Sequence, residues 1–441
     1  MPVSPAFQAR LDDALPRAVE RFGTPFHLYD EQGIDDTCTA FDRAFRSVGY
    51  TEYFAVKALP NPAILRILAR HGFGFDVSSG PELTLALRAG ARGRQICFNS
   101  NNTSRAELTA ALRADALITV DDATVLEKIA ELGAVPDTLA FRVNPGDDAH
   151  RGSRRHADTF LGDPADAKFG VPADRLTDVV ARAMTLGVRT VGLHMMLASN
   201  SLTAAPVLLT LELLLEQVLA LHRDTGVAVR TLNLGGGIGI PYRPGEPTAD
   251  IDALGRALRE RLDRWQQEYG LPAPRLCFES GRFITGPHGV LATRVVNRMS
   301  KWREYAGVDA SMTALMRPAL YRDAYHHITV PFARAAGPTE PVDVTGPLCE
   351  NNDRFGRDRP LPALREGDLL LIHDTGAHGH SMGFTYNGRL RPQELLLRRD
   401  GSIEMIRRAE DEHDHFATLE FPPAVVPAPA LVTMAGVAVP C

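Results

Sequence analysis

The chain has few of the features that mark a secreted, metal-binding or membrane protein. Its 441 residues include only five cysteines, and none lies in a CxxC pair or in another spacing typical of zinc sites. No uninterrupted apolar run reaches the ~20 residues that a membrane-spanning helix requires. The N-terminus also lacks an apolar stretch of signal-peptide type. These absences favour a cytoplasmic protein with reduced thiols, and they predict no metal site and no membrane partner.

Positive charge is not in excess either. There are 48 Lys and Arg residues against 54 Asp and Glu residues, so the formal net charge is −6 and a nucleic-acid partner is not expected. The composition, 44% hydrophobic and 23% charged, is ordinary for a globular protein. At roughly 100 to 200 residues per domain, the length allows two or three domains, or one barrel with an appendage.

Strand-like apolar runs alternate with helical segments through much of the chain. We expect strands at Tyr53–Val56, Gly74–Val77 and Thr190–Leu193, for example, with helices such as Gly80–Ala89 between them. Such alternation indicates parallel βα units. A count close to eight favours a closed TIM-like (β/α)8 barrel, with an open doubly wound sheet as the alternative.

The pattern changes beyond Gly281. Runs such as Gly289–Val296 and Asp368–His373, separated by Gly, Pro and Asp turns, predict a second, mostly β domain of sandwich or barrel-like form. We therefore divide the chain into an N-terminal segment that packs with the β domain, the barrel, the β domain and a mobile Pro-, Ala- and Val-rich tail: residues 1–32, 33–284, 285–421 and 422–441.

One lysine, Lys57, ends a short apolar run that predicts a buried strand. A lysine is strongly hydrated and is rarely buried without a partner or a task. One such task is Schiff-base chemistry with a carbonyl, commonly the aldehyde of pyridoxal 5'-phosphate (PLP). The alternative is a lysine at a strand end that extends its ammonium group to water.

A glycine-rich turn, Gly235-Gly236-Gly237, follows a predicted strand late in the alternating region. Glycines let the backbone approach a phosphate closely, and barrels often bind phosphate in the loops after their last strands. An ordinary tight turn is the alternative. The next predicted strand is followed directly by Glu279 and, three residues later, by Arg282. The acid could keep the pyridine nitrogen of PLP protonated, and the arginine could bind a phosphate or a carboxylate, unless the two form a structural ion pair.

Two further residues are weaker candidates. His194 ends a predicted strand and could stack on a cofactor ring, although isolated histidines are more often core residues. Cys349 lies in a turn-rich acidic loop, where a thiol could deliver a proton to a carbanion or simply pack as a small apolar group.

Six ordered motifs bring these residues together: Tyr53–Ala58, Asn233–Gly237, Glu279–Arg282, Leu315–Tyr321, Leu348–Asp353 and Tyr386–Arg389. Between about Thr24 and Pro422 the chain thus resembles the fold-type III PLP-dependent decarboxylases of the alanine racemase-like barrel family, and among them the diaminopimelate decarboxylases. The resemblance implies decarboxylation of meso-2,6-diaminopimelate to L-lysine and CO2, a step of lysine biosynthesis. It also implies a homodimer with composite active sites.

The same resemblance implies a role for each matching residue. The residues that would bind the cofactor are Lys57, His194, Gly235, Gly236, Gly237, Glu279, Gly281, Arg282, His378 and Tyr386. Those that would bind the substrate, at its remote carboxylate, are Arg282, Arg317, Tyr321 and Glu350. Lys57 would hold the cofactor as a Schiff base. Cys349, a proton donor, and Glu350 would act in the active site of the partner subunit.

Three positions depart from the commoner family pattern. Ser280 stands where most members have proline, His378 stands where many have tyrosine, and His194 is followed by Met-Met-Leu-Ala-Ser-Asn instead of x-Gly-Ser. These changes resemble a divergent branch of the diaminopimelate decarboxylases. The alternatives are a related decarboxylase of another amino acid in a specialised pathway, an amino-acid racemase, and a non-catalytic PLP-fold regulator. Intact Lys57, Glu279 and Cys349 count against the regulator.

Overall fold

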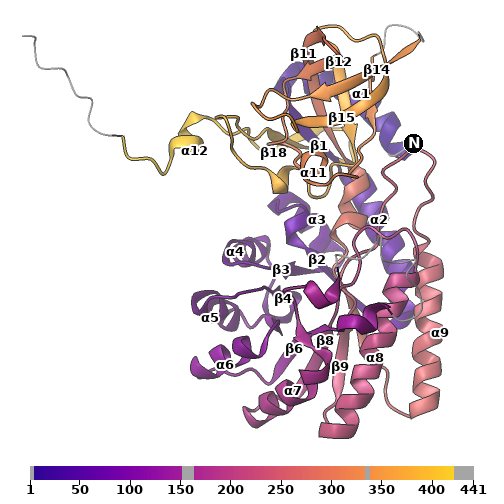
Figure 1. Cartoon of the computed structure of the whole chain (residues 1–441), viewed down its shortest axis with the longest axis vertical. Coiled ribbons are helices and arrows are strands. Elements are labelled where there is room, and N and C mark those ends of the chain that lie inside the picture. The colour runs from indigo at the N-terminus through magenta and orange to yellow at the C-terminus, as the bar shows by residue number, and fades with distance from the viewer. Residues whose placement is uncertain (1–3, 151–162, 333–337, 422–441) are drawn as a thin grey trace, which may run out of the picture.

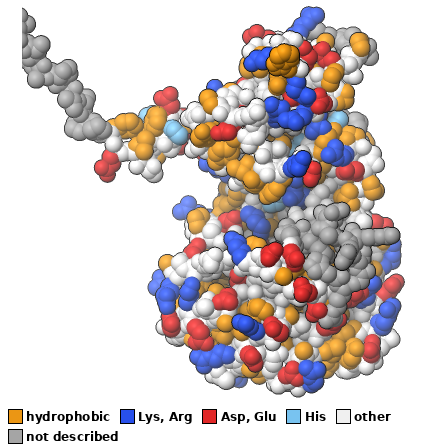
Figure 2. Space-filling view, in the orientation of Figure 1, with side chains coloured by type: hydrophobic (Ala, Val, Ile, Leu, Met, Phe, Trp, Pro, Cys, Tyr) orange, Lys and Arg blue, Asp and Glu red, His pale blue; other side chains and the backbone are white. Residues whose placement is uncertain are grey.

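The computed structural model describes residues 4–150, 163–332 and 338–421, so the predicted tail, 422–441, lies outside the described residues. Two bodies are stacked along the long axis of the molecule, a barrel surrounded by helices and a smaller domain built mostly of strands (Figure 1). Acidic and basic side chains are interspersed over the face of the barrel that Figure 2 shows.

Eight parallel strands form the barrel. They are β2 Tyr50–Ala55, β3 Gly74–Val77, β4 Ile96–Asn99, β5 Leu117–Val120, β6 Thr138–Asn144, β8 Thr190–His194, β9 Val229–Asn233 and β10 Arg275–Phe278. Each strand pairs with the next in parallel register, and β10 pairs with β2 to close the ring. The prediction of a closed barrel is therefore confirmed, and the open doubly wound sheet is wrong.

Helices surround the barrel (Figure 1). They are α2 Glu31–Phe45, α3 Pro62–Arg70, α4 Gly80–Ala89, α5 Arg105–Arg113, α6 Ala123–Glu131, α7 Leu176–Thr185, α8 Ala205–Thr225, α9 Ile251–Tyr269 and the short α10 Gly281–Thr285. Several begin at a side chain that accepts the first free backbone N–H groups, as Asn61, Ser79 and Ser104 do. We did not anticipate α9, because its many charged residues conceal a buried stripe at Leu254, Leu258 and Leu262.

The second domain is a sheet that includes a strand from the start of the chain. Its elements are β11 Gly289–Ser300, β12 Glu304–Val308, β13 Ile328–Thr329, β14 Thr339–Thr345, β15 Arg354–Pro362, β16 Leu369–His373, β17 Gln393–Leu397, β18 Ile403–Arg407 and the earlier β1 Phe26–Asp30. β1 is antiparallel to β11 and parallel to β17. The chain therefore begins in the second sheet, builds the barrel and returns, whereas the exact domain bounds stay a prediction.

Among the described residues, one helix has the length and composition of a membrane span. α8 contains an 18-residue window with a mean hydropathy of 1.5, but half of that window is buried inside the protein. Figure 1 shows α8 running along the side of the barrel, next to α9. A buried core helix passes the same test of length and composition, so α8 is weak evidence for a membrane span.

Candidate active site

Polar side chains gather at the carboxyl ends of the barrel strands, the end where barrel enzymes carry out their chemistry. At or next to these ends stand Asp76, Asn99, Arg142, His194, Asn233 and Glu279. Asn99 and Arg142 are partly buried, and the other four side chains are buried. Removing so many polar groups from water requires that they satisfy one another or a ligand.

Lys57 lies in a short turn, Val56–Ala58, directly after β2. Its Nζ is 3.0 Å from Oδ2 of Asp76, which comes from the neighbouring strand β3 and is 1% exposed. The carboxylate of Asp76 is the main cause that raises the pKa of Lys57. Desolvation opposes this rise, although the Lys57 side chain is 49% exposed, and Glu279 adds to it. Burial in turn raises the pKa of Asp76, as does Glu279, while Lys57 lowers it. The two groups thus form a charge-compensated pair.

Glu279 occupies the centre of the polar cluster. Its Oε1 accepts hydrogen bonds from Nδ2 of Asn233 at 2.8 Å and from Nδ2 of Asn99 at 3.1 Å, and it lies 3.5 Å from Nε2 of His194. Burial acts to raise the pKa of Glu279, but the neighbouring His194, and after it Lys57 and Arg142, lower it well below its ordinary value. This carboxylate therefore stays ionised although it is buried.

The glycine-rich turn lies against Glu279. A Cβ atom on Gly236 would come within 2.6 Å of the carbonyl oxygen of Glu279, and one on Gly237 within 2.7 Å of the carbonyl oxygen of Ala198. Gly235 and Gly237 also have positive φ angles of 69° and 91°. Only glycine satisfies both demands, and the result is the close backbone approach that phosphate sites use.

Ser280, the departure from the family's proline, has a specific local role. Its backbone N–H donates to Oε1 of Glu52 at 2.6 Å, and this acid is 2% exposed. Burial raises the pKa of Glu52 to about 8, against the effect of that hydrogen bond. Proline has no N–H, so a buried acid at position 52 and a residue with a backbone donor at position 280 depend on each other.

Two predicted arginines, Arg282 of α10 and Arg317 of the second domain, meet at one tyrosine. Nη1 of Arg282 donates to the phenol oxygen of Tyr242 at 2.5 Å, and the guanidinium carbon of Arg317 lies 4.5 Å from the centre of the same ring. Arg317 begins the short helix α11 Arg317–Leu320, and Tyr321, half exposed, follows that helix. The fold thus brings the two cations together from positions 35 residues apart, on different domains.

The second domain also reaches the Lys57 turn. The backbone N–H of His378 donates to the carbonyl oxygen of Ala58 at 2.9 Å, and the Ser381 hydroxyl donates to the same oxygen at 3.2 Å. Nδ2 of Asn61 donates to Oε2 of Glu394 at 3.1 Å. The pKa of His378 is well below its ordinary value, first because of burial and then because of nearby Arg282, Lys57 and Arg317. His378 therefore lies near both the lysine and the arginines, as an uncharged group.

Three predicted residues stand apart from this cluster within one chain. Cys349 and Glu350 are exposed, and Tyr386 is 46% exposed. The backbone N–H of Cys349 donates to Oδ1 of Asn387 at 2.8 Å, so the two loops that carry these residues adjoin. Among the described residues, no hydrogen bond or ion pair joins either loop to Lys57.

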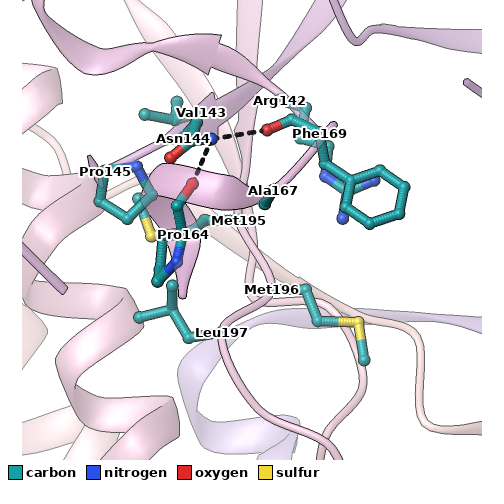
Figure 3. A pocket seen from close by; sticks show the side chains of 10 residues that line it. All are labelled: Arg142, Val143, Asn144, Pro145, Pro164, Ala167, Phe169, Met195, Met196 and Leu197. Carbon is teal, nitrogen blue, oxygen red and sulfur yellow. Dashed lines mark hydrogen bonds between the residues drawn. The ribbon is translucent and has the colours of Figure 1, made fainter. Parts of the chain in front are cut away.

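A small cavity opens between the end of β6 and the segment Met195–Leu197 that follows β8 (Figure 3). Figure 3 shows Arg142 alongside the ring of Phe169, and the guanidinium carbon is 4.3 Å from the ring centre. Nδ2 of Asn144 donates to the carbonyl oxygens of Pro164 and Phe169, and Met195 and Leu197 lie on the opposite wall. The cavity is mostly apolar and adjoins the polar cluster.

Several residues of the cluster were missed from the sequence: Asp76, Asn99, Arg142, Asn233 and Tyr242. A usable signal existed for the first four, because a polar residue at the carboxyl end of a barrel strand belongs to the catalytic face. Tyr242 carries no such signal. Its place between two arginines depends on how the loop after β9 meets the second domain.

The polar cluster fits PLP. Both ring nitrogens of His194 are buried without a hydrogen-bond partner, which leaves the ring to contact a ligand face. An ionised carboxylate, Glu279, a close-packed glycine turn and Lys57 supply the groups that a pyridine nitrogen, a phosphate and an aldehyde would need.

Comparisons with known proteins point to the same cofactor. Residues 31–286 match the family described as pyridoxal-dependent decarboxylase, pyridoxal binding domain. Protein TabA of Pseudomonas amygdali pv. tabaci is 46% identical over 426 residues, which cover 97% of this chain and 98% of that protein. The diaminopimelate decarboxylase of Methanothermobacter thermautotrophicus is 37% identical over 397 residues, 90% of this chain and 91% of that one.

Two solved structures of diaminopimelate decarboxylases have a fold similar to that of this chain. Diaminopimelate decarboxylase from Helicobacter pylori, complexed with L-lysine, is 28% identical, with a TM-score of 0.81 over 91% of this chain and 98% of that chain. The enzyme from M. jannaschii, also in complex with L-lysine, is 30% identical, with a TM-score of 0.82 over 92% of this chain and 94% of that chain.

Proposed function

This chain belongs to the pyridoxal-dependent decarboxylase family, and on that premise we propose that it converts meso-2,6-diaminopimelate to L-lysine and CO2. The observation that carries the choice of substrate is the meeting of Arg282 and Arg317 at Tyr242. Two guanidinium groups at one place suit an anionic substrate group, and the substrate proposed here has a second carboxylate at its far end.

When bound, PLP supplies the electron sink that accepts the electron pair left by the departing carboxylate. Lys57 would hold the cofactor covalently between turnovers. The carboxylate of Asp76 forms an ion pair with Lys57 at 3.0 Å, which holds the amine in place and balances its charge. Glu279, kept ionised by its neighbours, would keep the ring nitrogen protonated, and His194, 3.5 Å from Glu279, would contact the ring.

Selectivity follows from the far end of the substrate. A substrate without a second carboxylate would leave the buried guanidinium group of Arg317 and the partly buried one of Arg282 unpaired, at a cost of several kcal/mol. Ornithine and lysine should therefore be poor substrates, because neither carries a carboxylate at the end remote from the reacting carbon.

We propose that the working form is a homodimer in the cytoplasm. Cys349 and Glu350 are exposed, and neither makes a described hydrogen bond or ion pair with Lys57 of its own chain, so they are available to a neighbouring subunit. In the dimer, Cys349 would deliver a proton to the carbon that loses CO2, and Glu350 would contact the substrate. The four cysteines that the structure describes are unpaired thiols, which suits a reducing compartment.

A second candidate is the decarboxylation of another amino acid in a specialised pathway. What favours it is that the relative at 46% identity, Protein TabA, exceeds the diaminopimelate decarboxylase at 37%, and its name states no substrate. A racemase is disfavoured because it must keep the carboxylate and place bases on both faces of the reacting carbon.

The test is CO2 release from meso-diaminopimelate measured beside D- and L-lysine, ornithine and arginine. We expect release from diaminopimelate to exceed that from each other amino acid by about a hundredfold or more, in line with loss of a buried ion pair. Comparable release from ornithine or arginine would refute the proposed substrate and leave the reaction class intact.

A further inference from the structure

Tyr242 contacts both arginines through different parts of its side chain. Its phenol oxygen accepts from Nη1 of Arg282 at 2.5 Å, and its ring face lies 4.5 Å from the guanidinium carbon of Arg317. Tyr242 is 6% exposed and follows the glycine-rich turn in the loop after β9. A cation over an aromatic face is attracted to the ring without losing its charge.

His326 contacts Arg317 from the other side. Its Nδ1 lies 2.7 Å from the carbonyl oxygen of His373, and its Nε2 lies 2.9 Å from Nη1 of Arg317. A carbonyl oxygen only accepts and a guanidinium only donates, so Nδ1 carries the proton and Nε2 is the acceptor. His326 is fully buried, and its ring lies edge-on to that of Tyr242, with 5.0 Å between the centres. It is therefore a neutral imidazole.

No described carboxylate lies within ion-pair distance of either arginine. Asp374, whose pKa Arg317 influences, is 1% exposed and has no hydrogen-bond partner on either oxygen. Burial raises its pKa well above the ordinary value, and Arg317 acts against that rise. Nε of Arg317 is also buried and unpartnered. The pair of cations thus keeps an unused donor and its full charge.

We propose that Tyr242 and His326 are positioning residues, which hold the guanidinium groups of Arg282 and Arg317 together for one anionic substrate group without neutralising them. A carboxylate at either position would pair with an arginine and consume its charge before substrate arrives. Neutral acceptors fix the geometry and leave the charge available. Preference for a substrate with a remote carboxylate would then depend on these two uncharged side chains, an inference that rests on the proposed function.

The test compares His326→Glu with His326→Gln in the PLP-loaded enzyme. Glutamine can accept from Arg317 and donate to the His373 carbonyl, whereas glutamate adds a counter-charge. We measure by calorimetry the affinities of L-lysine and of cadaverine, which lacks the carboxylate, together with KM and kcat for diaminopimelate. We expect His326→Glu to weaken L-lysine binding and raise KM by about tenfold or more, as expected for a charged hydrogen bond. Cadaverine binding, kcat and His326→Gln should stay near wild type.

Tyr242→Phe provides an independent variant, because it keeps the ring beneath Arg317 and removes only the acceptor for Arg282. It should also lose preference for L-lysine over cadaverine, by about tenfold or more, because one hydrogen bond to a charged group is lost. If His326→Glu does not fold, this variant alone decides. Unchanged preference in Tyr242→Phe, or equal L-lysine affinity in both His326 variants, would overturn the inference.

The wild-type enzyme separates this failure from a failure of the proposed function. If wild type neither releases CO2 from diaminopimelate nor prefers L-lysine over cadaverine, the proposed substrate is wrong, and the inference falls with it. If wild type does both and the variants match it, only the role of Tyr242 and His326 is wrong.

Discussion

The two ends of the active site differ in how their charges are balanced. At one end, Lys57 pairs with Asp76 at 3.0 Å, and Glu279 receives hydrogen bonds from two asparagines. At the other end, Arg282 and Arg317 share Tyr242 and have no carboxylate partner among the described residues. The lysine end is compensated before any ligand binds. The arginine end is arranged by neutral groups and needs an anion.

The difference shows how one site can separate reaction from selection. Opposite charges at the lysine end fix protonation states, because each charge stabilises the other. Like charges at the arginine end cost free energy until a carboxylate arrives, so binding energy there is reserved for substrates that carry one. Four changes test this comparison, from the largest expected effect to the smallest.

The lysine end should fail completely when its amine is removed. Lys57→Ala should lower the turnover rate by orders of magnitude, because no amine remains to form a covalent bond with the cofactor. The visible absorbance band of lysine-bound PLP should be absent from this variant. Borohydride, which removes that band in the wild-type enzyme, should therefore have no effect on it. The matched control is Lys301→Ala, an exposed lysine of the second domain. Wild-type activity in Lys57→Ala would remove the basis of the proposed mechanism.

The arginine end should affect substrate binding more than turnover. Arg317→Leu should raise KM for diaminopimelate by about a hundredfold, because a desolvated pair loses one partner. The absorbance of bound PLP should not change. Arg322→Leu, an exposed arginine five positions later, is the control. If kcat falls while KM is constant, the arginine acts on the reaction itself and the separation of the two ends is false.

Cys349 lies at neither end within one chain, so subunit mixing locates it. Inactive Lys57→Ala and Cys349→Ala subunits should restore about a quarter of wild-type activity per subunit, because half the dimers are mixed and each has one intact site. Mass spectrometry verifies the exchange. If mixed dimers form and activity does not return, Cys349 serves the active site of its own chain and the composite site is wrong.

The smallest expected effect is on stability, and it comes from the hydrogen bond between the Ser280 backbone N–H and Glu52. Ser280→Pro should destabilise the protein by about 1 to 3 kcal/mol, because buried Glu52 loses the N–H that it accepts from. Ser280→Ala keeps that N–H and is the matched control. Thermal unfolding measures both variants. Equal melting temperatures for the two would mean that Glu52 finds another donor.

Local patterns predicted the barrel and the groups on its strand ends that have a chemical signature, such as Lys57 and Glu279. They did not predict the partners. Asp76 lies beside Lys57 because Ala55 of β2 pairs with Asp76 of β3, a register that no single segment reveals. His326 and Tyr242 meet only where two domains pack, so their roles arise from tertiary contacts. The roles predicted for Cys349, Glu350 and Tyr386 depend on a partner subunit and stay predictions.

The position of β1 restricts how this molecule can move. The chain leaves the second sheet at Asp30, completes the barrel and re-enters the sheet at Gly289. The two bodies are therefore joined by two connections of the polypeptide chain. A rotation about one flexible linker is therefore not available to them. Hydrogen bonds from His378 and Ser381 to Ala58 add further restraint beside the lysine. We expect the spacing between the lysine and arginine ends to change little as substrate enters, so the proposed site would select substrates by the distance between the reacting carbon and the remote carboxylate.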